Sequence, residues 1–205
     1  HSLLRKDDTA MSMSWTGHWV TKEMDAWVGI NTMKNWDDFT KALKNFGVPG
    51  QNIVYADADG NIGWRPAVFI PVRKEGFSMV PRPGNDSQYD WKGKVPYSQM
   101  PYLFNPPGGY ISTANNKTIG DNFPYYISGL WADPSRAEQI KKRLDTLVNA
   151  EVEDMKSIQL ELTSPFAQEI TPYILAVEKG DETENLARAF RYLREWNGVE
   201  GVDSE

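Results

Sequence analysis

Prolines and glycines crowd the middle of this 205-residue sequence, and they limit which regular structures the chain can form there. Proline fixes φ and lacks an amide N–H, so helix interiors and central strands exclude it. Between residues 75 and 109 the turn-forming residues are Pro81, Pro83, Gly84, Asn85, Pro96, Pro101, Pro106, Pro107, Gly108 and Gly109. The tyrosines and tryptophan in the same region make it too apolar for a disordered linker. We therefore expect an ordered segment without long helices or strands.

Short elements precede this segment. Residues 10–16 alternate like a strand, and apolar residues at helical spacing predict helices over residues 21–33 and 35–46. The apolar positions assigned to the first of these helices are Val20, Met24, Trp27 and Val28. Asp59-Gly60 between two apolar runs predicts a hairpin with strands at residues 52–57 and 61–64, and residues 68–73 should extend that sheet.

The Asp57-x-Asp59-x-Asn61 spacing has two interpretations. It imitates the opening of a calcium-binding loop, in which these oxygens would be ligands. The twelfth position of such a loop would be Val68, where a bidentate glutamate is required. Turn formation at the tip of a hairpin explains the same three polar side chains without any metal.

The last third of the sequence is helical in pattern. Asp133 is a helix cap followed by a proline at the first helical position, and Ile140, Leu144 and Leu147 form the expected buried stripe. Further helices are expected over residues 152–162, 164–174 and 184–196. The fold class is therefore α+β, with antiparallel strands in the first half and helices in the last third. We expect one domain over residues 1–205, with a strand and helix-pair part at 1–132 and a helical part at 133–198.

Composition excludes several functional classes. The 22 basic and 28 acidic residues are mixed along the chain, so the cationic stripe that nucleic acid requires is missing. No apolar run approaches the roughly 20 residues that span a bilayer, so we expect no membrane span. Cysteine is absent, which excludes disulfides and thiolate nucleophiles. The two histidines, His1 and His18, are too few for a histidine-rich metal site, and we expect both near the surface.

Three features could carry chemistry. Residues 110–113 alternate as a strand should, and Asn115 and Asn116 at its end could aim N–H donors into a cleft or simply form a turn. Arg136 puts positive charge near the positive end of a helix dipole, so it either has a partner outside the helix or is a plain surface side chain. Trp27 is either a core residue or part of an aromatic ligand pocket.

A series of ordered motifs covers most of residues 10–147. It comprises Ala26-Trp27, Lys34-Asn35-Trp36, Asn52-x-x-Tyr55-Ala56-Asp57-x-x-Gly60-Asn61-Ile62-Gly63, Ile70-Pro71-Val72-Arg73, Pro83-Gly84, Tyr89-Asp90-Trp91-Lys92-Gly93, Met100-Pro101, Asn105-Pro106-Pro107-x-Gly109-Tyr110-Ile111-x-x-x-Asn115-Asn116 and Leu130-Trp131-x-x-x-x-Arg136. In this order the chain resembles the penicillin acylase (penicillin amidase) family of N-terminal-nucleophile hydrolases.

The resemblance implies a four-layer αββα fold and hydrolysis of an amide, such as that of penicillin G, between an acyl group and an amine-bearing core. Family members mature from a secreted precursor that cleaves itself, which implies an extracellular or periplasmic location. The serine thereby exposed at the start of the large chain attacks the amide. Asn115 matches the family's oxyanion asparagine and Arg136 its active-site arginine. Trp27 matches a wall of the acyl pocket, and Gln51 falls where an apolar pocket residue is often found.

The chain also departs from the family pattern. The nucleophilic serine would lie upstream of residue 1, and Ser2 matches no nucleophile position, so we expect a large-chain fragment that is inactive alone. Its partner would be the remainder of its own precursor. An aspartate of the family's calcium site aligns near Tyr125, although Asp121 could substitute after a loop shift. We therefore assign no metal ligands and no certain cofactor, with Ca²⁺ possible only in the full-length enzyme.

Two alternatives stay open. Within the family, the substrate could instead be an acyl-homoserine lactone or a cyclic lipopeptide. From another class, the chain could be a non-catalytic carbohydrate-binding module that stacks sugars on Trp64, Tyr89 and Trp91.

Overall fold

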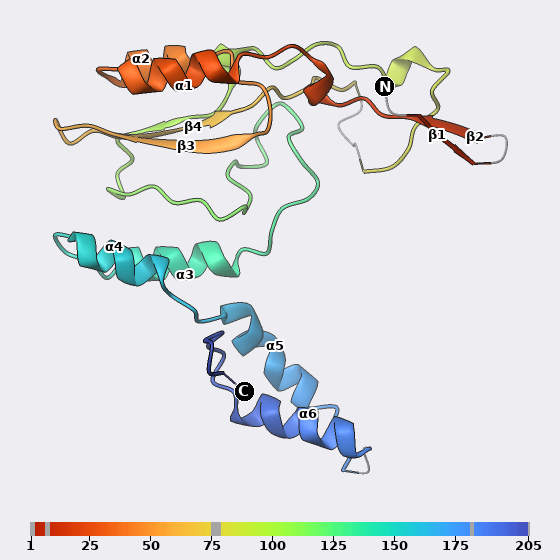
Figure 1. The fold of residues 1–205 in the computed structure, drawn as a ribbon, viewed down its shortest axis with the longest axis vertical. Helices are drawn as coiled ribbons and strands as arrows, with labels where there is room; N and C mark the ends of the chain where they lie inside the picture. The colour runs from red at the N-terminus through yellow and green to blue at the C-terminus, as the bar shows by residue number, and fades with distance from the viewer. Residues whose placement is uncertain (1–2, 7–8, 75–78, 181–182, 205) are drawn as a thin grey trace. The chain divides into compact units, whose positions relative to one another are not determined.

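The computed structural model describes residues 3–6, 9–74, 79–180 and 183–204 (Figure 1). The chain divides into two compact units. The first unit comprises His1–Ile111 and Lys117–Trp131, and the second comprises Ser112–Asn116 and Ala132–Glu205. Helices and small antiparallel sheets make the fold α+β. Within the described residues, no helix combines the length and apolar character needed to cross a membrane.

The predicted hairpin forms the main sheet of the first unit. Strands β3 (Gln51–Ala56) and β4 (Ile62–Ala67) pair antiparallel, and β5 (Leu103–Phe104) adds to the other edge of β4. This confirms the hairpin, although β4 extends three residues beyond the predicted strand and β5 was not predicted.

Hydrogen bonds within the turn occupy the carboxylate of Asp57. Its Oδ1 accepts from the backbone N–H of Asp59 at 3.0 Å and of Asn61 at 2.9 Å, and its Oδ2 accepts from the Tyr55 hydroxyl at 2.7 Å. The bond to Tyr55 lowers the pKa of Asp57 and raises that of Tyr55 to about 12. The three polar residues of this spacing therefore act as turn residues.

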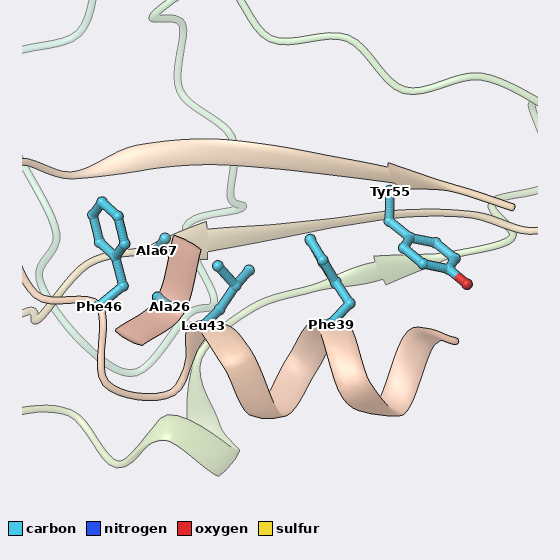
Figure 2. Close-up of a cluster of buried hydrophobic side chains, with 6 residues drawn as sticks. All are labelled: Ala26, Phe39, Leu43, Phe46, Tyr55 and Ala67. Atoms are coloured by element: carbon cyan, nitrogen blue, oxygen red, sulfur yellow. The ribbon is translucent and has the colours of Figure 1, made fainter. Parts of the chain in front are cut away.

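Two helices cover one face of this sheet (Figure 1). They are α1 (Glu23–Thr32) and α2 (Trp36–Leu43), which confirms both predicted helices, and the Asn35 side chain caps α2 by accepting from the Asp38 N–H at 2.9 Å. The core between helices and sheet consists of Ala26, Phe39, Leu43, Phe46, Tyr55 and Ala67 (Figure 2).

The buried face of α1 differs from the predicted one. Met24 and Val28 are exposed, and Trp27 is 43% exposed, whereas Ala26 is buried against the core with Ile30 packed beside it. The small Ala26 side chain allows close approach between backbones, and a pattern based on large apolar residues overlooks it.

Three further predictions for strands need correction. The strand expected at residues 10–16 is β2 (Thr9–Ser12), which pairs with β1 (Leu3–Lys6) and ends before a 3₁₀ turn, η1 (Thr16–His18). Residues 68–73 do not extend the sheet. Pro71 instead bridges to Lys94, because the Val72 and Val95 amides donate to carbonyls across a short antiparallel pairing. Pro71 itself cannot donate to a ladder. The strand expected at residues 110–113 is also absent from the described elements.

In the proline-rich segment, residues 79–109 contain only the 3₁₀ turns η2 (Ser87–Tyr89) and η3 (Tyr97–Gln99) and the two-residue β5. This confirms an ordered stretch without long elements, although residues 75–78 lie outside the described chain.

The second unit is helical, as predicted. Its helices are α3 (Ser135–Leu144), α4 (Val152–Gln159), α5 (Pro165–Leu175) and α6 (Glu184–Glu195), with α5 packing against both α3 and α6. An ion pair between Arg143 and Glu161, 2.7 Å long, ties the end of α3 to the segment that follows α4. The stripe of Ile140, Leu144 and Leu147 is only half-buried.

The Glu23 side chain ties the first turn of α1 to the loop after α2. Its Oε1 accepts from the N–H of Gly47 and of Val48, each at 3.0 Å, and its Oε2 accepts from the Thr21 hydroxyl at 2.8 Å. Burial opposes ionisation of this carboxyl, but the hydrogen bonds outweigh burial and lower its pKa from 4.5 to about 2.

We predict that Glu23→Gln lowers the free energy of unfolding of the complete protein by roughly 1 kcal/mol near neutral pH, after discounting for solvent screening. Because the folded-state pKa is the lower one, this contribution is fully present above pH 4.5 and is lost as the pH falls through about 2. Urea unfolding of both proteins over this range should show their difference shrinking with acidity. A difference independent of pH would contradict the prediction.

Candidate functional site

The two asparagines follow a segment that is not a strand. Residues 110–113 were predicted as a strand, but they form no β-ladder with any described residue. An alternating pattern does not produce a β-strand without a neighbouring strand to pair with. The chain bends immediately afterwards. Asn115 has a left-handed φ of 60°, and the Ala114 N–H donates to the Asn116 Oδ1 at 3.0 Å across this bend.

Arg136 lies in the first turn of α3, in the same unit as the bend. The Asp133 Oδ1 accepts from the Ser135 N–H at 2.9 Å, and hydrogen bonding from the side chain and the backbone of Ser135 lowers the pKa of Asp133. The helix therefore begins one residue later than predicted: Pro134 is its N-cap residue, and Asp133 hydrogen-bonds the first helical N–H from just before the cap. The Arg136 Nη2 donates to the Ala114 carbonyl at 2.8 Å and to the Asn115 Oδ1 at 3.0 Å. The positive charge of Arg136 is unfavourably placed at the positive end of the α3 dipole. The Ala114 carbonyl and the Asn115 Oδ1 are the partners outside the helix that hold it there.

The contact with Arg136 also orients the Asn115 carboxamide. Because Oδ1 is the atom that accepts from the guanidinium, Nδ2 points elsewhere with its two N–H donors. Within the described part of the second unit, no residue accepts from these donors, and the side chain is exposed. A neutral donor fixed beside a positive charge suits the stabilisation of an oxygen that becomes negative during a reaction.

Trp27 and Gln51 belong to the first unit. Trp27 lies on α1, where its ring meets that of Phe46 edge-on with centroids 5.8 Å apart. Gln51 is the first residue of β3, opposite Ala67, and its side chain is exposed. The structure therefore brings Asn115 and Arg136 together, and it shows Trp27 and Gln51 as accessible side chains of the other unit.

The remaining candidates fit other roles. His18 is exposed beside the Trp15 ring, as expected, whereas His1 and Ser2 lie outside the described residues. Trp64 is 3% exposed and its indole N–H donates to the Asn52 Oδ1, so this ring is not available for sugar stacking.

The two residues considered for a calcium ion, Tyr125 and Asp121, have other partners. Tyr125 donates its hydroxyl to Gln99, and Asp121 is paired with Lys117. Across the described ranges, no group of three or more histidine, cysteine, aspartate or glutamate side chains could hold a metal ion.

The Ala132 amide is a part of the site that the sequence did not identify, whereas Asn116 takes the turn-forming role that the sequence left open for it. The Ala132 N–H donates to the Asn115 carbonyl at 3.0 Å, closing the bend from the other side. The adjacent asparagines were the available signal, since asparagine side chains hydrogen-bond nearby backbone in turns. A backbone donor such as Ala132 leaves no signal in the sequence.

The chain is similar in sequence to known acylases. The sequence model of the family described as Penicillin amidase matches residues 2–205. The chain is 34% identical over 124 residues to the penicillin acylase 2 proenzyme of Pseudomonas sp. (strain SE83), covering 60% of this chain and 16% of that protein. It is 32% identical over 152 residues both to the acyl-homoserine lactone acylase QuiP of Pseudomonas fluorescens (strain Pf0-1) and to the penicillin G acylase of Escherichia coli. These matches cover 73% and 70% of this chain, and 18% of each relative.

Its fold is shared with a solved acylase. The thermostable penicillin G acylase from Alcaligenes faecalis superposes with a TM-score of 0.64 at 23% identity, covering 87% of this chain and 32% of that one. Of the sequence relatives named in the preceding paragraph, the chain spans less than a fifth of the length of each.

Proposed function

The chain belongs to the penicillin amidase family, and from that premise we propose that it is part of the large chain of an amide-hydrolysing acylase. The observation that carries this proposal is the hydrogen bond between Arg136 and Asn115, which orients a carboxamide donor at the position that the family motifs assign to the oxyanion asparagine. The proposed enzyme removes an acyl group from an amine-bearing core.

In the proposed reaction, a serine hydroxyl attacks the amide carbonyl and transfers its proton to the α-amino group of the same serine. The carbonyl electron pair moves to oxygen, where the Asn115 Nδ2 donates a hydrogen bond to the resulting oxyanion. Collapse of this intermediate breaks the C–N bond, the amine leaves with the proton, and water then hydrolyses the acyl-enzyme. Arg136 touches the oxyanion donor, so it maintains the orientation of Asn115 and adds positive charge nearby.

The nucleophilic serine is proposed to lie outside this chain. The rest of the precursor would supply it, in keeping with the relative that is named a proenzyme, and the chain would be inactive by itself. We propose that the complete enzyme has a four-layer αββα fold, arises by self-cleavage and is located outside the cell or in the periplasm.

The acyl group is the part of the substrate that this chain would help to select. We propose that Trp27 and Gln51 contribute to the acyl pocket, because both side chains are accessible in the first unit. Relatives of comparable identity are named as penicillin acylases and as acyl-homoserine lactone acylases. Penicillin G-type acyl amides are the first substrate class to test, and long-chain acyl-homoserine lactones and lipopeptides are the second.

The test is release of primary amine by the complete protein from a phenylacetyl amide, a long-chain acyl-homoserine lactone and an acylated lipopeptide. Hydrolysis of any one amide supports the proposal, and the relative rates identify the acyl preference. A processed protein that cleaves none of them, yet is retarded on a polysaccharide gel, would favour a binding module instead.

A further inference from the structure

The backbone conformation of Asn115 needs support from its neighbours. Its φ of 60° lies in the left-handed region, which is unfavourable for most L-residues, although asparagine tolerates it better than most. Rotation of this residue to the ordinary right-handed region would swing its side chain away from its present direction. The direction of the Nδ2 donors therefore depends on whatever holds the bend.

Hydrogen bonds hold the peptide groups on both sides of Asn115. The Ala114 carbonyl belongs to the peptide plane before it and accepts from Arg136 at 2.8 Å. The Asn115 carbonyl belongs to the plane after it and accepts from the Ala132 N–H at 3.0 Å. Both dihedral angles of Asn115 are thereby restrained.

The Asn116 side chain closes the bend between these two planes. Its Oδ1 accepts from the Ala114 N–H at 3.0 Å, so the carboxamide reaches back across Asn115. Ala114 is buried, with 7% of its surface exposed, and an N–H there without a partner would be costly. The hydrogen bond between Ala114 and Asn116 therefore forms together with the left-handed conformation of Asn115, the residue between them.

We propose that Asn116 is a positioning residue that keeps Asn115 in its left-handed conformation and so aims the oxyanion donor. This inference rests on the proposed function, because it assigns Asn116 a role through Asn115. Without the Asn116 acceptor, Asn115 spends part of its time in conformations that turn Nδ2 away from the reacting carbonyl. The loss falls on the transition state, where the oxyanion exists, and leaves substrate binding nearly intact.

The test compares Asn116→Ala with Asn197→Ala in the complete enzyme. Asn197 is a matched control in the same unit, because its Oδ1 also accepts from a backbone N–H two residues away, that of Val199 at 2.9 Å. Asn116→Ala should lower kcat about tenfold with KM nearly unchanged, as the loss of one hydrogen bond implies, and Asn197→Ala should leave both parameters near wild type. Asn116→Asp keeps the acceptor oxygen and should retain most of the activity.

A double variant shows whether Asn116 acts through Asn115. If it does, adding Asn116→Ala to Asn115→Ala should cause no further fall in kcat. The inference would be overturned if Asn116→Ala lowered kcat equally in the wild-type and Asn115→Ala backgrounds. It would also be overturned if Asn116→Ala and Asn116→Asp lost equal activity, or if Asn116→Ala changed only KM. If Asn115→Ala itself leaves turnover unchanged, the proposed oxyanion role is wrong instead.

Discussion

Replacing Asn115 with alanine is expected to lower kcat of the complete acylase by about 10²–10³-fold, equivalent to roughly 2.7–4 kcal/mol of transition-state stabilisation. The variant removes the whole carboxamide. In the wild type its Oδ1 accepts from Arg136 at 3.0 Å, and its N–H donors therefore point away from that contact. Because the donor matters most when the carbonyl oxygen carries negative charge, KM should change little. Steady-state hydrolysis of the preferred acyl amide, normalised to active-site concentration, measures both parameters.

Glycine at the same position separates the lost donor from backbone strain. Alanine at a φ of 60° is strained, whereas glycine adopts this conformation freely, so a folding defect would appear mainly in Asn115→Ala. If the donor carries the effect, Asn115→Gly should lose as much kcat as Asn115→Ala. Normal turnover in either folded variant would show that the oxyanion assignment is wrong.

Local signals in the sequence predicted the elements that depend on neighbouring residues. The Asp59-Gly60 turn gave the correct hairpin, because the Asp57 carboxylate is satisfied within the turn itself. The Asn35 cap similarly marked the start of α2. Such features need no information from distant parts of the chain.

Pairing between distant segments was not predictable in the same way. Residues 110–113 alternate in polarity but have no ladder partner among the described residues, whereas Leu103 and Phe104 form a strand because Trp64 and Gly63 lie opposite them. The prediction of the buried face of α1 was wrong for a related reason. Ala26 is buried in a cluster with residues of α2 and of the sheet, and helical periodicity alone does not report such neighbours.

The candidate site shows the same division. The odd charge placement of Arg136 indicated a partner outside its helix, and the structure contains a hydrogen bond from Arg136 to Asn115. The bend that aims Asn115 depends on an Ala132 amide and on a carboxamide that bonds backwards to Ala114. Backbone groups are the same at every position, so their role emerges only once the chain is folded.

Replacing Phe39 with alanine is expected to destabilise the complete protein by about 3–5 kcal/mol. Phe39 is 1% exposed in the core of the first unit (Figure 2). Its ring centroid lies 5.3 Å from those of Trp36 and Tyr55. Alanine would remove the transfer energy of the ring and leave a cavity that the paired strands and the capped helix cannot readily fill.

Phe39→Leu is the graded control, because it keeps an apolar side chain of closer volume and should lose about 1.5 kcal/mol or less. Urea midpoints of the three proteins, followed by tryptophan fluorescence, measure the series. Trp36 packs against the Phe39 ring, so its fluorescence reports unfolding of this core. If the core unfolds cooperatively with the rest of the first unit, the fluorescence midpoint should shift together with the midpoint for loss of secondary structure. Equal midpoints for the alanine and leucine variants would show that Phe39 is not the centre of this core.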